Sequence, residues 1–406
     1  MKHTVYNACD RLDSAEARAL LSGRRLGLIT NMSGVTRELR TTASAIAKRY
    51  SLAALFGPEH GIRGAAQAGG HDAADTIDSE TGVPVYDLFG KHKAAAEAAF
   101  AALDAVVFDI QDIGVRYYTY QFTLLDAMRL AAKHRVPMIV LDRINPIGGV
   151  NILGNRIDAD CISGVGAVVS QPAVCGMTIG ELALWFNAHL SVGAEISVLR
   201  CEGWRREMWF DDTDLLHVPP SPNMPSLDAN ILYPGTCFFE GTTLSEGRGT
   251  TKPFELFGAP WMDPSRVIDA MYALPAEARE AFSGLVMRPC AFTPTFHKHQ
   301  GELCGGIQLH VRDRHALDMY AAGLYFLQVL RELYPAECTF REGLARLVGT
   351  KRVLADDFDA AAYLASQKPG IAAFAAERAE YLLYFPKKSQ YFDKNKIFSN
   401  NIKIYL

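Results

Sequence analysis

This 406-residue chain has no long apolar run, no dominant charge of one sign and no clustered cysteines. No window approaches the roughly 18 apolar residues of a membrane-spanning helix, and the N-terminus MKHTVYNACDRL lacks a signal-peptide core. The 41 Lys and Arg nearly balance the 45 Asp and Glu, whereas a nucleic-acid partner requires a strongly basic face. We therefore expect a cytoplasmic protein without membrane or nucleic-acid partners, with export possible if a leader was removed.

Several cofactor and catalytic motifs are also absent. The eight cysteines are scattered without a C-x-x-C, so we expect reduced thiols and no structural zinc. No G-x-G-x-x-G follows the first predicted strand, and no G-x-x-x-x-G-K-[ST] occurs, so no nucleotide cofactor is expected. The nucleophile elbow G-x-S-x-G and the zincin motif H-E-x-x-H are missing too. We expect neither cofactor nor metal.

The first 150 residues alternate short apolar runs with amphipathic stretches, which is typical of a mostly parallel sheet covered by helices. The predicted strands are 26–30, 52–56, 105–108 and 136–141, and the predicted helices are 41–50, 92–103 and 121–134. A further helix is predicted over 178–190, where Thr178 and Glu181 have the spacing of a capping box. These patterns predict an α/β fold.

Three units are expected along the chain. Four prolines in 218–225 (VPPSPNMP) indicate a stiff loop inside the first unit, residues 1–262. From residue 263 the pattern changes to helices and two β-rich runs, 285–296 and 306–311, which predicts a smaller α+β domain over 263–385. The last 21 residues, 386–406, hold five lysines but no Arg, Ala or Gly, and we expect a disordered, appended tail.

Polar residues follow each predicted strand, where an open α/β sheet binds its ligands. They include Asn31, Glu59 with His60, the pair Asp109 and Asp112 around Gln111, and Arg143 with Asn145. Glycines and prolines fix these loops, as a preorganised site requires. The sequence therefore predicts a polar site at one edge of the sheet.

Carboxylates are the most informative of these groups. Glu59 stands out because Glu is neither a good cap nor a good turn former, whereas Asp109 and Asp112 could simply accept backbone N–H bonds. Glu246 lies with Glu240 on a Gly/Thr-rich segment. Paired carboxylates can hydrolyse glycosides, and the same groups can bind Mg²⁺. Both possibilities stay open at this point.

Arginines close to the site loops suggest a carboxylate-bearing ligand, because a guanidinium fork binds carboxylates in two-point fashion. The candidates are Arg63, Arg116, Arg143 and Arg248, although Arg116 and Arg143 could equally pair with neighbouring Asp residues. Tyr118 could stack on a sugar face, and His60 could orient Glu59. His297 and His299 are interpreted as structural, because a metal site would need a third ligand.

Long motifs in a fixed order resemble one known family. They are GLITNMSGVT (27–36), LFGPEHGIRG (55–64), VPVYDLFG (83–90), VVFDIQDIGVRYYTY (106–120), VLDRINPIGG (140–149), GMTIGELA (176–183), PSPNMPSLDANILYPGTCFFEGTTLSEGRGTTKPFELFGAPW (220–261) and GELCGGIQLHV (301–311). Together they resemble the exo-β-N-acetylmuramidase family from about residue 25 to about 385.

The resemblance implies a Rossmann-like larger N-terminal domain, a smaller α+β C-terminal domain and an active site in the cleft between them. It implies an exo-acting glycoside hydrolase that releases terminal N-acetylmuramic acid from peptidoglycan fragments such as MurNAc-GlcNAc. In the G-P-E-H-G motif of the family the glutamate, here Glu59, is the proposed catalytic residue. We expect Asp109 or Asp112 to assist it.

Further expectations concern the substrate. The lactyl carboxylate of muramic acid requires an arginine clamp. The expected binding residues are Asn31, His60, Arg63, Gln111, Arg116, Tyr118, Arg143, Asn145, Asn223, Glu246 and Arg248. The partners are small peptidoglycan-derived saccharides, and the chain is a monomer or homodimer. The competing hypotheses are a non-catalytic muropeptide-binding protein and a Mg²⁺-dependent hydrolase using Glu59, Asp109 and Asp112.

Overall fold

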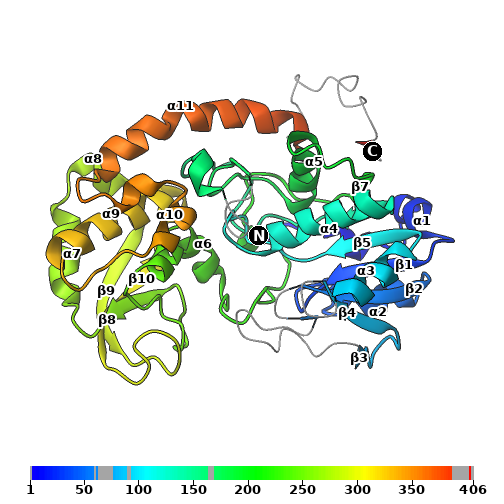
Figure 1. Ribbon diagram of the computed structural model, residues 1–406, viewed down its shortest axis with the longest axis horizontal. Coiled ribbons are helices and arrows are strands. Elements are labelled where there is room, and N and C mark those ends of the chain that lie inside the picture. Colours follow the sequence, from blue (N-terminus) through cyan, green and yellow to red (C-terminus); the bar gives the residue numbers. More distant parts are fainter. Residues whose placement is uncertain are drawn as a thin grey trace.

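A parallel sheet forms the centre of the larger N-terminal unit (Figure 1). The computed structural model describes residues 2–58, 61–62, 76–88, 93–162, 169–385 and 402–403. The parallel strands lie in the order β4-β2-β1-β5-β6-β7. Their bounds are β1 Leu26–Thr30, β2 Leu52–Gly57, β4 Pro84–Asp87, β5 Ala105–Asp109, β6 Met138–Leu141 and β7 Ile196–Leu199. Counted along the chain, this is the 3-2-1-4-5-6 order of Rossmann-type folds, which confirms the predicted fold class.

Helices cover both faces of this sheet because its strands are apolar on both sides. Ile29, Val106 and Phe108 pack in one core with helices α3, α4 and α5. Leu28 and Val107, which alternate with them, pack in a second core with α1 and α2. The helix bounds are α1 Ala15–Leu21, α2 Thr42–Ala47, α3 Lys93–Ala101, α4 Tyr120–His134 and α5 Ile179–His189.

The predicted capping box begins α5. The Thr178 side chain accepts a hydrogen bond from the backbone N–H of Glu181, and the Glu181 carboxylate accepts one from the N–H of Thr178. Of the six parallel strands given above, β4 and β7 were not predicted. Each has only four residues, and β4 begins with a proline. Runs this short are hard to distinguish from loops by periodicity.

The smaller unit contains a three-stranded antiparallel sheet in the order β8-β10-β9. The bounds are β8 Leu256–Ala259, β9 Leu285–Phe292 and β10 Cys304–Val311. Its helices are α6 Leu227–Thr236, α7 Pro264–Ala273, α8 Ala276–Glu280, α9 Met319–Leu333, α10 Glu342–Val348 and α11 Ala360–Arg378. The boundary expected at 262/263 separates β8 from the sheet to which it is paired. We therefore propose that the smaller domain begins with α6.

The two units are joined by the polypeptide connection between them and also by contacts of the C-terminal segment. Helix α11 runs from the smaller unit to α5 of the larger one (Figure 1). Beyond it, the backbone N–H of Leu383 donates to Glu181 (2.7 Å), and the Tyr384 hydroxyl donates to Asp142 (2.5 Å). One apolar core also continues through both units. The C-terminal segment therefore fastens the smaller unit onto the larger one.

Within the predicted tail the structure describes only β11 (Ile402–Lys403), which pairs in parallel with β7. The expected disorder of the tail stays a prediction. Two-residue β3 (Thr76–Ile77) extends the opposite edge of the sheet, where it pairs antiparallel with β4. Across the described parts of the chain, none of the helices combines the length and apolar character needed to span a bilayer.

Arg116 links the two units through backbone carbonyls. Its guanidinium donates to the carbonyls of Asn155 (2.7 Å) and Gln171 (2.9 Å) in the larger unit. It also donates to those of Leu347 (3.1 Å) and Val348 (2.8 Å) in α10. The side chain is buried, so these acceptors replace water. Both terminal nitrogens of Arg116 thus serve the domain interface, and only the buried Nε has no hydrogen-bond partner in the described structure.

We expect Arg116→Lys to lower the free energy of unfolding by roughly 2–4 kcal/mol, because an ammonium cannot reach carbonyls on both units and leaves some of them unpaired. Urea unfolding at neutral pH measures the loss. The matched control is Arg129→Lys, an exposed arginine on α4 whose replacement should change the free energy by less than about 0.5 kcal/mol. Equal effects of the two changes would contradict the structural role of Arg116.

Candidate active site

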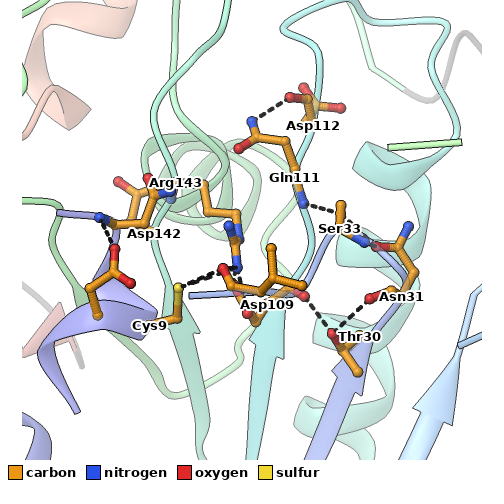
Figure 2. A network of polar contacts seen from close by, with 12 residues as sticks. Cys9, Thr30, Asn31, Ser33, Asp109, Gln111, Asp112, Asp142 and Arg143 are labelled. Carbon is orange, nitrogen blue, oxygen red and sulfur yellow. Dashed lines mark hydrogen bonds and ion pairs between the residues drawn. The ribbon is translucent and has the colours of Figure 1, made fainter. Parts of the chain in front are cut away.

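A hydrogen-bonded frame joins the loops after β1 and β5, which lie at the point where the strand order reverses (Figure 2). The Asn31 side-chain oxygen accepts from the backbone N–H (2.9 Å) and the hydroxyl (2.6 Å) of Ser33. The Ser33 hydroxyl in turn accepts from the backbone N–H of Gln111 (3.0 Å). Asn31 and Gln111 are therefore brought together, as predicted, but their polar atoms largely hold each other's loops.

Asp109 and Arg143 form a closed ion pair beside this frame. Arg143 Nε lies 2.6 Å from Asp109 Oδ1, and Nη2 lies 2.8 Å from Oδ2. Both side chains are buried, and Arg143 Nη2 also donates to the carbonyl of Val35 (2.9 Å). A catalytic role for Asp109 stays a prediction. The ion pair does not favour this role, because both carboxylate oxygens accept hydrogen bonds from Arg143.

The proline-rich segment closes the crevice above the frame. The carbonyl of Pro220 accepts hydrogen bonds from Asn31 Nδ2 (3.2 Å) and from the Tyr120 hydroxyl (2.7 Å). Between this segment and the sheet, a cavity of about 30 Å³ remains, lined by Gln111, Arg143 and His217 among others. That volume is about the share of one water molecule in the liquid. A sugar ring does not fit in that space.

Asp112 is a buried carboxylate without an ion-pair partner in the described structure. Its Oδ2 accepts from the backbone N–H of Gly114 (2.8 Å) and from Gln121 Nε2 (3.1 Å), whereas Oδ1 has no partner in the described structure. Burial raises the pKa of Asp112 to about 6, and the hydrogen bonds from Gln121 and Gly114 oppose the shift. This carboxyl group therefore exchanges a proton near neutral pH.

Other predicted residues have different surroundings. Asn145 holds the chain locally, since its amide donates to the carbonyl of Met177 (3.0 Å) and its oxygen accepts from the N–H of Ile147 (3.1 Å). Asn223 lies in the proline-rich segment and is almost buried. Three predicted residues lie outside the described part of the chain, namely Glu59, His60 and Arg63.

An aromatic wall leads from the larger unit into the smaller one. The Tyr118 ring meets the Tyr233 ring edge-on at 5.8 Å, and Tyr233 meets Phe254 at 4.7 Å. The Arg248 guanidinium lies over Phe254, 5.2 Å from the ring centre. These contacts connect Tyr118 and Arg248, two predicted residues that are 130 positions apart in the sequence.

Arg248 sits in a charged cluster at the end of this wall. Its Nη2 donates to Glu240 (2.6 Å), and its Nε lies 3.2 Å from Glu246. Lys298 Nζ (3.1 Å) and His297 Nδ1 (3.2 Å) also contact the fully buried Glu246 carboxylate. Although burial alone would raise it, the pKa of Glu246 is held well below its usual range by these three neighbours. Glu246 is therefore an anionic anchor of the cluster.

Lys298 was not predicted from the sequence. Besides Glu246, its ammonium binds the carbonyls of Phe239 (2.7 Å), Glu240 (3.2 Å) and Leu244 (2.8 Å). His297 and His299 on either side have left-handed backbone conformations, with φ of 70° and 56°. Such strained residues persist only where the surroundings fix them. The structure adds a contact between His297 and Glu246 to the structural role that the sequence suggested. No spacing in the sequence indicated this contact.

Comparisons with known proteins agree with this two-domain arrangement. The family models for the N-terminal and C-terminal parts of the exo-β-N-acetylmuramidase NamZ match residues 26–228 and 231–384. The peptidoglycan β-N-acetylmuramidase NamZ of Bacillus subtilis (strain 168) is 44% identical over 322 residues, which cover 79% of this chain and 76% of that protein. The two models meet about where α6 begins.

Two crystal structures of DUF1343 family proteins from Bacteroides fragilis NCTC 9343 are also similar. One superimposes with a TM-score of 0.84 at 30% identity, and the other with 0.71 at 29%. Each comparison covers 94% of this chain and 99% of the other chain. The fold and sequence together define a glycosidase with a Rossmann-like domain. The chain belongs to the exo-β-N-acetylmuramidase NamZ family, which confirms the resemblance.

The raised pKa of Asp112 makes a prediction about stability. A raised carboxyl pKa stabilises the folded protein below the unfolded value of 3.8, and this contribution is lost as the pH rises through about 6. Asp112→Asn stays neutral at every pH. We therefore expect the variant to be more stable than the wild type at pH 8, by up to about 3 kcal/mol, and no more stable at pH 4. Urea unfolding at both pH values measures the difference; a gain that is equal at both would rule out the titration of Asp112.

Proposed function

We propose that this protein is an exo-acting glycoside hydrolase that releases N-acetylmuramic acid from the non-reducing ends of peptidoglycan fragments such as MurNAc-GlcNAc. The observation that carries the proposal is the match of both family models, which together span nearly the whole described chain. The relative from Bacillus subtilis is named as a peptidoglycan β-N-acetylmuramidase. Small peptidoglycan-derived saccharides are then the partners of the site.

We propose Glu59 as the general acid, on the strength of its sequence position. It follows Gly57, the last residue of β2, by two positions, and β2 is the direct neighbour of β1 in the sheet. Ligands of such sheets bind beyond the carboxyl ends of the strands. Glu59 would protonate the glycosidic oxygen as the bond to the muramic acid breaks.

Asp112 is the better supported partner carboxylate. It has an oxygen without a hydrogen bond and no neighbouring cation, whereas Asp109 is neutralised by Arg143. As a carboxylate, Asp112 could orient the acetamido group of the substrate or act on water. Its separation from Glu59 would decide between the retaining and inverting courses.

Arg248 is the candidate clamp for the lactyl carboxylate. Of the four predicted arginines, Arg116 donates to backbone carbonyls and Arg143 pairs with Asp109. Arg63 lies outside the described residues. The Arg248 side chain keeps 16% of its surface exposed, and its Nη1 has no hydrogen bond within the described structure. It lies at the end of the aromatic wall, whose rings are buried and hold its position.

The cytoplasmic location and the monomeric or dimeric state stay predictions from the sequence. Cell fractionation and light scattering would test them. Both are independent of the reaction proposed here.

Replacing the proposed acid should nearly abolish turnover. We expect Glu59→Gln to reduce MurNAc release from MurNAc-GlcNAc by about 10²–10⁴-fold, because the neutral amide cannot protonate the leaving oxygen. Chromatography of the released sugars measures the rate. Glu38→Gln, at an exposed glutamate, is the matched control and should retain wild-type turnover. Wild-type turnover by Glu59→Gln would overturn the assignment, and binding without product by the wild type would favour the sugar-binding alternative.

Arg248 should discriminate substrates by their carboxylate. We expect Arg248→Lys to lower kcat/KM for MurNAc-GlcNAc by about 10–100-fold, because an ammonium cannot form the two-point contact. A GlcNAc-GlcNAc substrate lacks the lactyl group, so its much slower hydrolysis should change little. Parallel assays of both substrates give the ratio. An equal loss on both would mean that Arg248 acts on the fold rather than on the carboxylate.

A further inference from the structure

Two carboxylates share the guanidinium of Arg248, and they differ in their burial and in their other ion-pair partners. Glu246 is fully buried and contacts Lys298 and His297 as well. Glu240 keeps 29% of its side-chain surface exposed, and Arg248 is its only ion-pair partner in the described structure. Glu240 is thus the more exposed of the two carboxylates that pair with Arg248.

An incoming carboxylate has to share Arg248 with Glu240. A two-point contact with a guanidinium uses either the two terminal nitrogens or Nε with Nη2. Nη2 already donates to Glu240 (2.6 Å), and Nε faces Glu246 (3.2 Å). Either geometry brings a ligand carboxylate next to the Glu240 carboxylate. Two carboxylates about 3 Å apart cannot both stay ionised, because their repulsion favours a shared proton.

We propose that binding of an anionic sugar to Arg248 is coupled to the uptake of one proton from solvent by the Glu240 carboxylate. This inference rests on the proposed clamp role of Arg248. It makes recognition of the lactyl carboxylate a proton-dependent step and makes Glu240 a specificity-determining residue.

The charged groups around Glu240 support it as the proton acceptor. It lies on the short 3₁₀ helix Cys237–Gly241, facing Arg248, Glu246 and Lys298 from two loops. Tyr233 of α6 and Cys237 lie close to it, and Arg341 before α10 acts on Lys298. Burial raises the pKa of Glu240, Arg248 opposes the shift and Glu246 adds to it. Glu246, with its pKa lowered, is the weaker competitor for the proton.

The charge balance points the same way. The cations Arg248 and Lys298 are matched one for one by the carboxylates Glu240 and Glu246. A ligand carboxylate would leave this cluster with an excess negative charge in a largely buried place. Protonation of Glu240 restores the balance and frees one donor of Arg248.

Calorimetric titration of the full-length protein with free N-acetylmuramic acid tests the coupling. The titrations are run at one pH in buffers of different ionisation enthalpy, with neutral N-acetylglucosamine as the comparison ligand. At a pH where free Glu240 is ionised, we expect uptake of close to one proton per bound N-acetylmuramic acid and none with N-acetylglucosamine. Glu240→Gln should abolish the uptake, whereas Glu332→Gln, at an exposed position of α9, should keep it.

A second measurement needs no variant. In the wild type, the Kd for N-acetylmuramic acid should rise by about tenfold per pH unit once Glu240 ionises, because each binding event then requires a proton. The Kd for N-acetylglucosamine should stay flat over the same range. In Glu240→Gln the Kd for N-acetylmuramic acid should become independent of pH and stay low at alkaline pH.

The outcomes separate the two proposals. Selective binding of N-acetylmuramic acid without proton uptake, and with a flat Kd, would overturn the coupling while leaving the clamp and the hydrolase intact. Equal affinity for both sugars, unchanged in Arg248→Lys, would overturn the clamp itself. Proton uptake that persists in Glu240→Gln would assign the proton to another group and contradict the role of Glu240.

Discussion

The guanidinium of Arg143 ties together the ends of three neighbouring strands. Arg143 follows β6, its fork holds Asp109 at the end of β5, and its Nη2 reaches the carbonyl of Val35 after β1. Removing either partner of such a buried pair leaves an uncompensated charge, so the arrangement is held firmly. The polar edge of the sheet is therefore a rigid base for the loops that follow its strands.

That rigid base determines where a substrate can bind. The carbonyl of Pro220 accepts hydrogen bonds from Asn31 and Tyr120. The proline-rich segment therefore occupies the crevice in which Rossmann folds bind dinucleotides. The saccharide site proposed above lies at the border with the smaller unit, next to Arg248. Arg116 and the segment around Tyr384 hold that unit in place, so the aromatic wall and the Arg248 cluster are preorganised.

The overall charge makes the local cations of this border more important. The chain has a formal net charge of −4. The five lysines of its last 21 residues offset part of a larger negative charge on residues 1–385. An anionic sugar gains nothing from that long-range field. In the proposed clamp its attraction comes from Arg248 at short range, where Glu240 and Glu246 already pair with the guanidinium.

The sequence by itself determined the α/β fold, the capped helix α5, the stiff proline-rich segment and, through long ordered motifs, the family. These depend on local pattern, turn chemistry and motif order, which act over short stretches. It also singled out Asp112 and Arg248. Only the tertiary structure decided that Arg116 and Arg143 are bound by the fold and that β8 belongs to the second sheet. It also decided that Glu240 pairs with Arg248 and that Lys298 pairs with Glu246. The reason is physical: whether a charged side chain is free depends on partners distant in sequence, and no spacing along the chain encodes those distances.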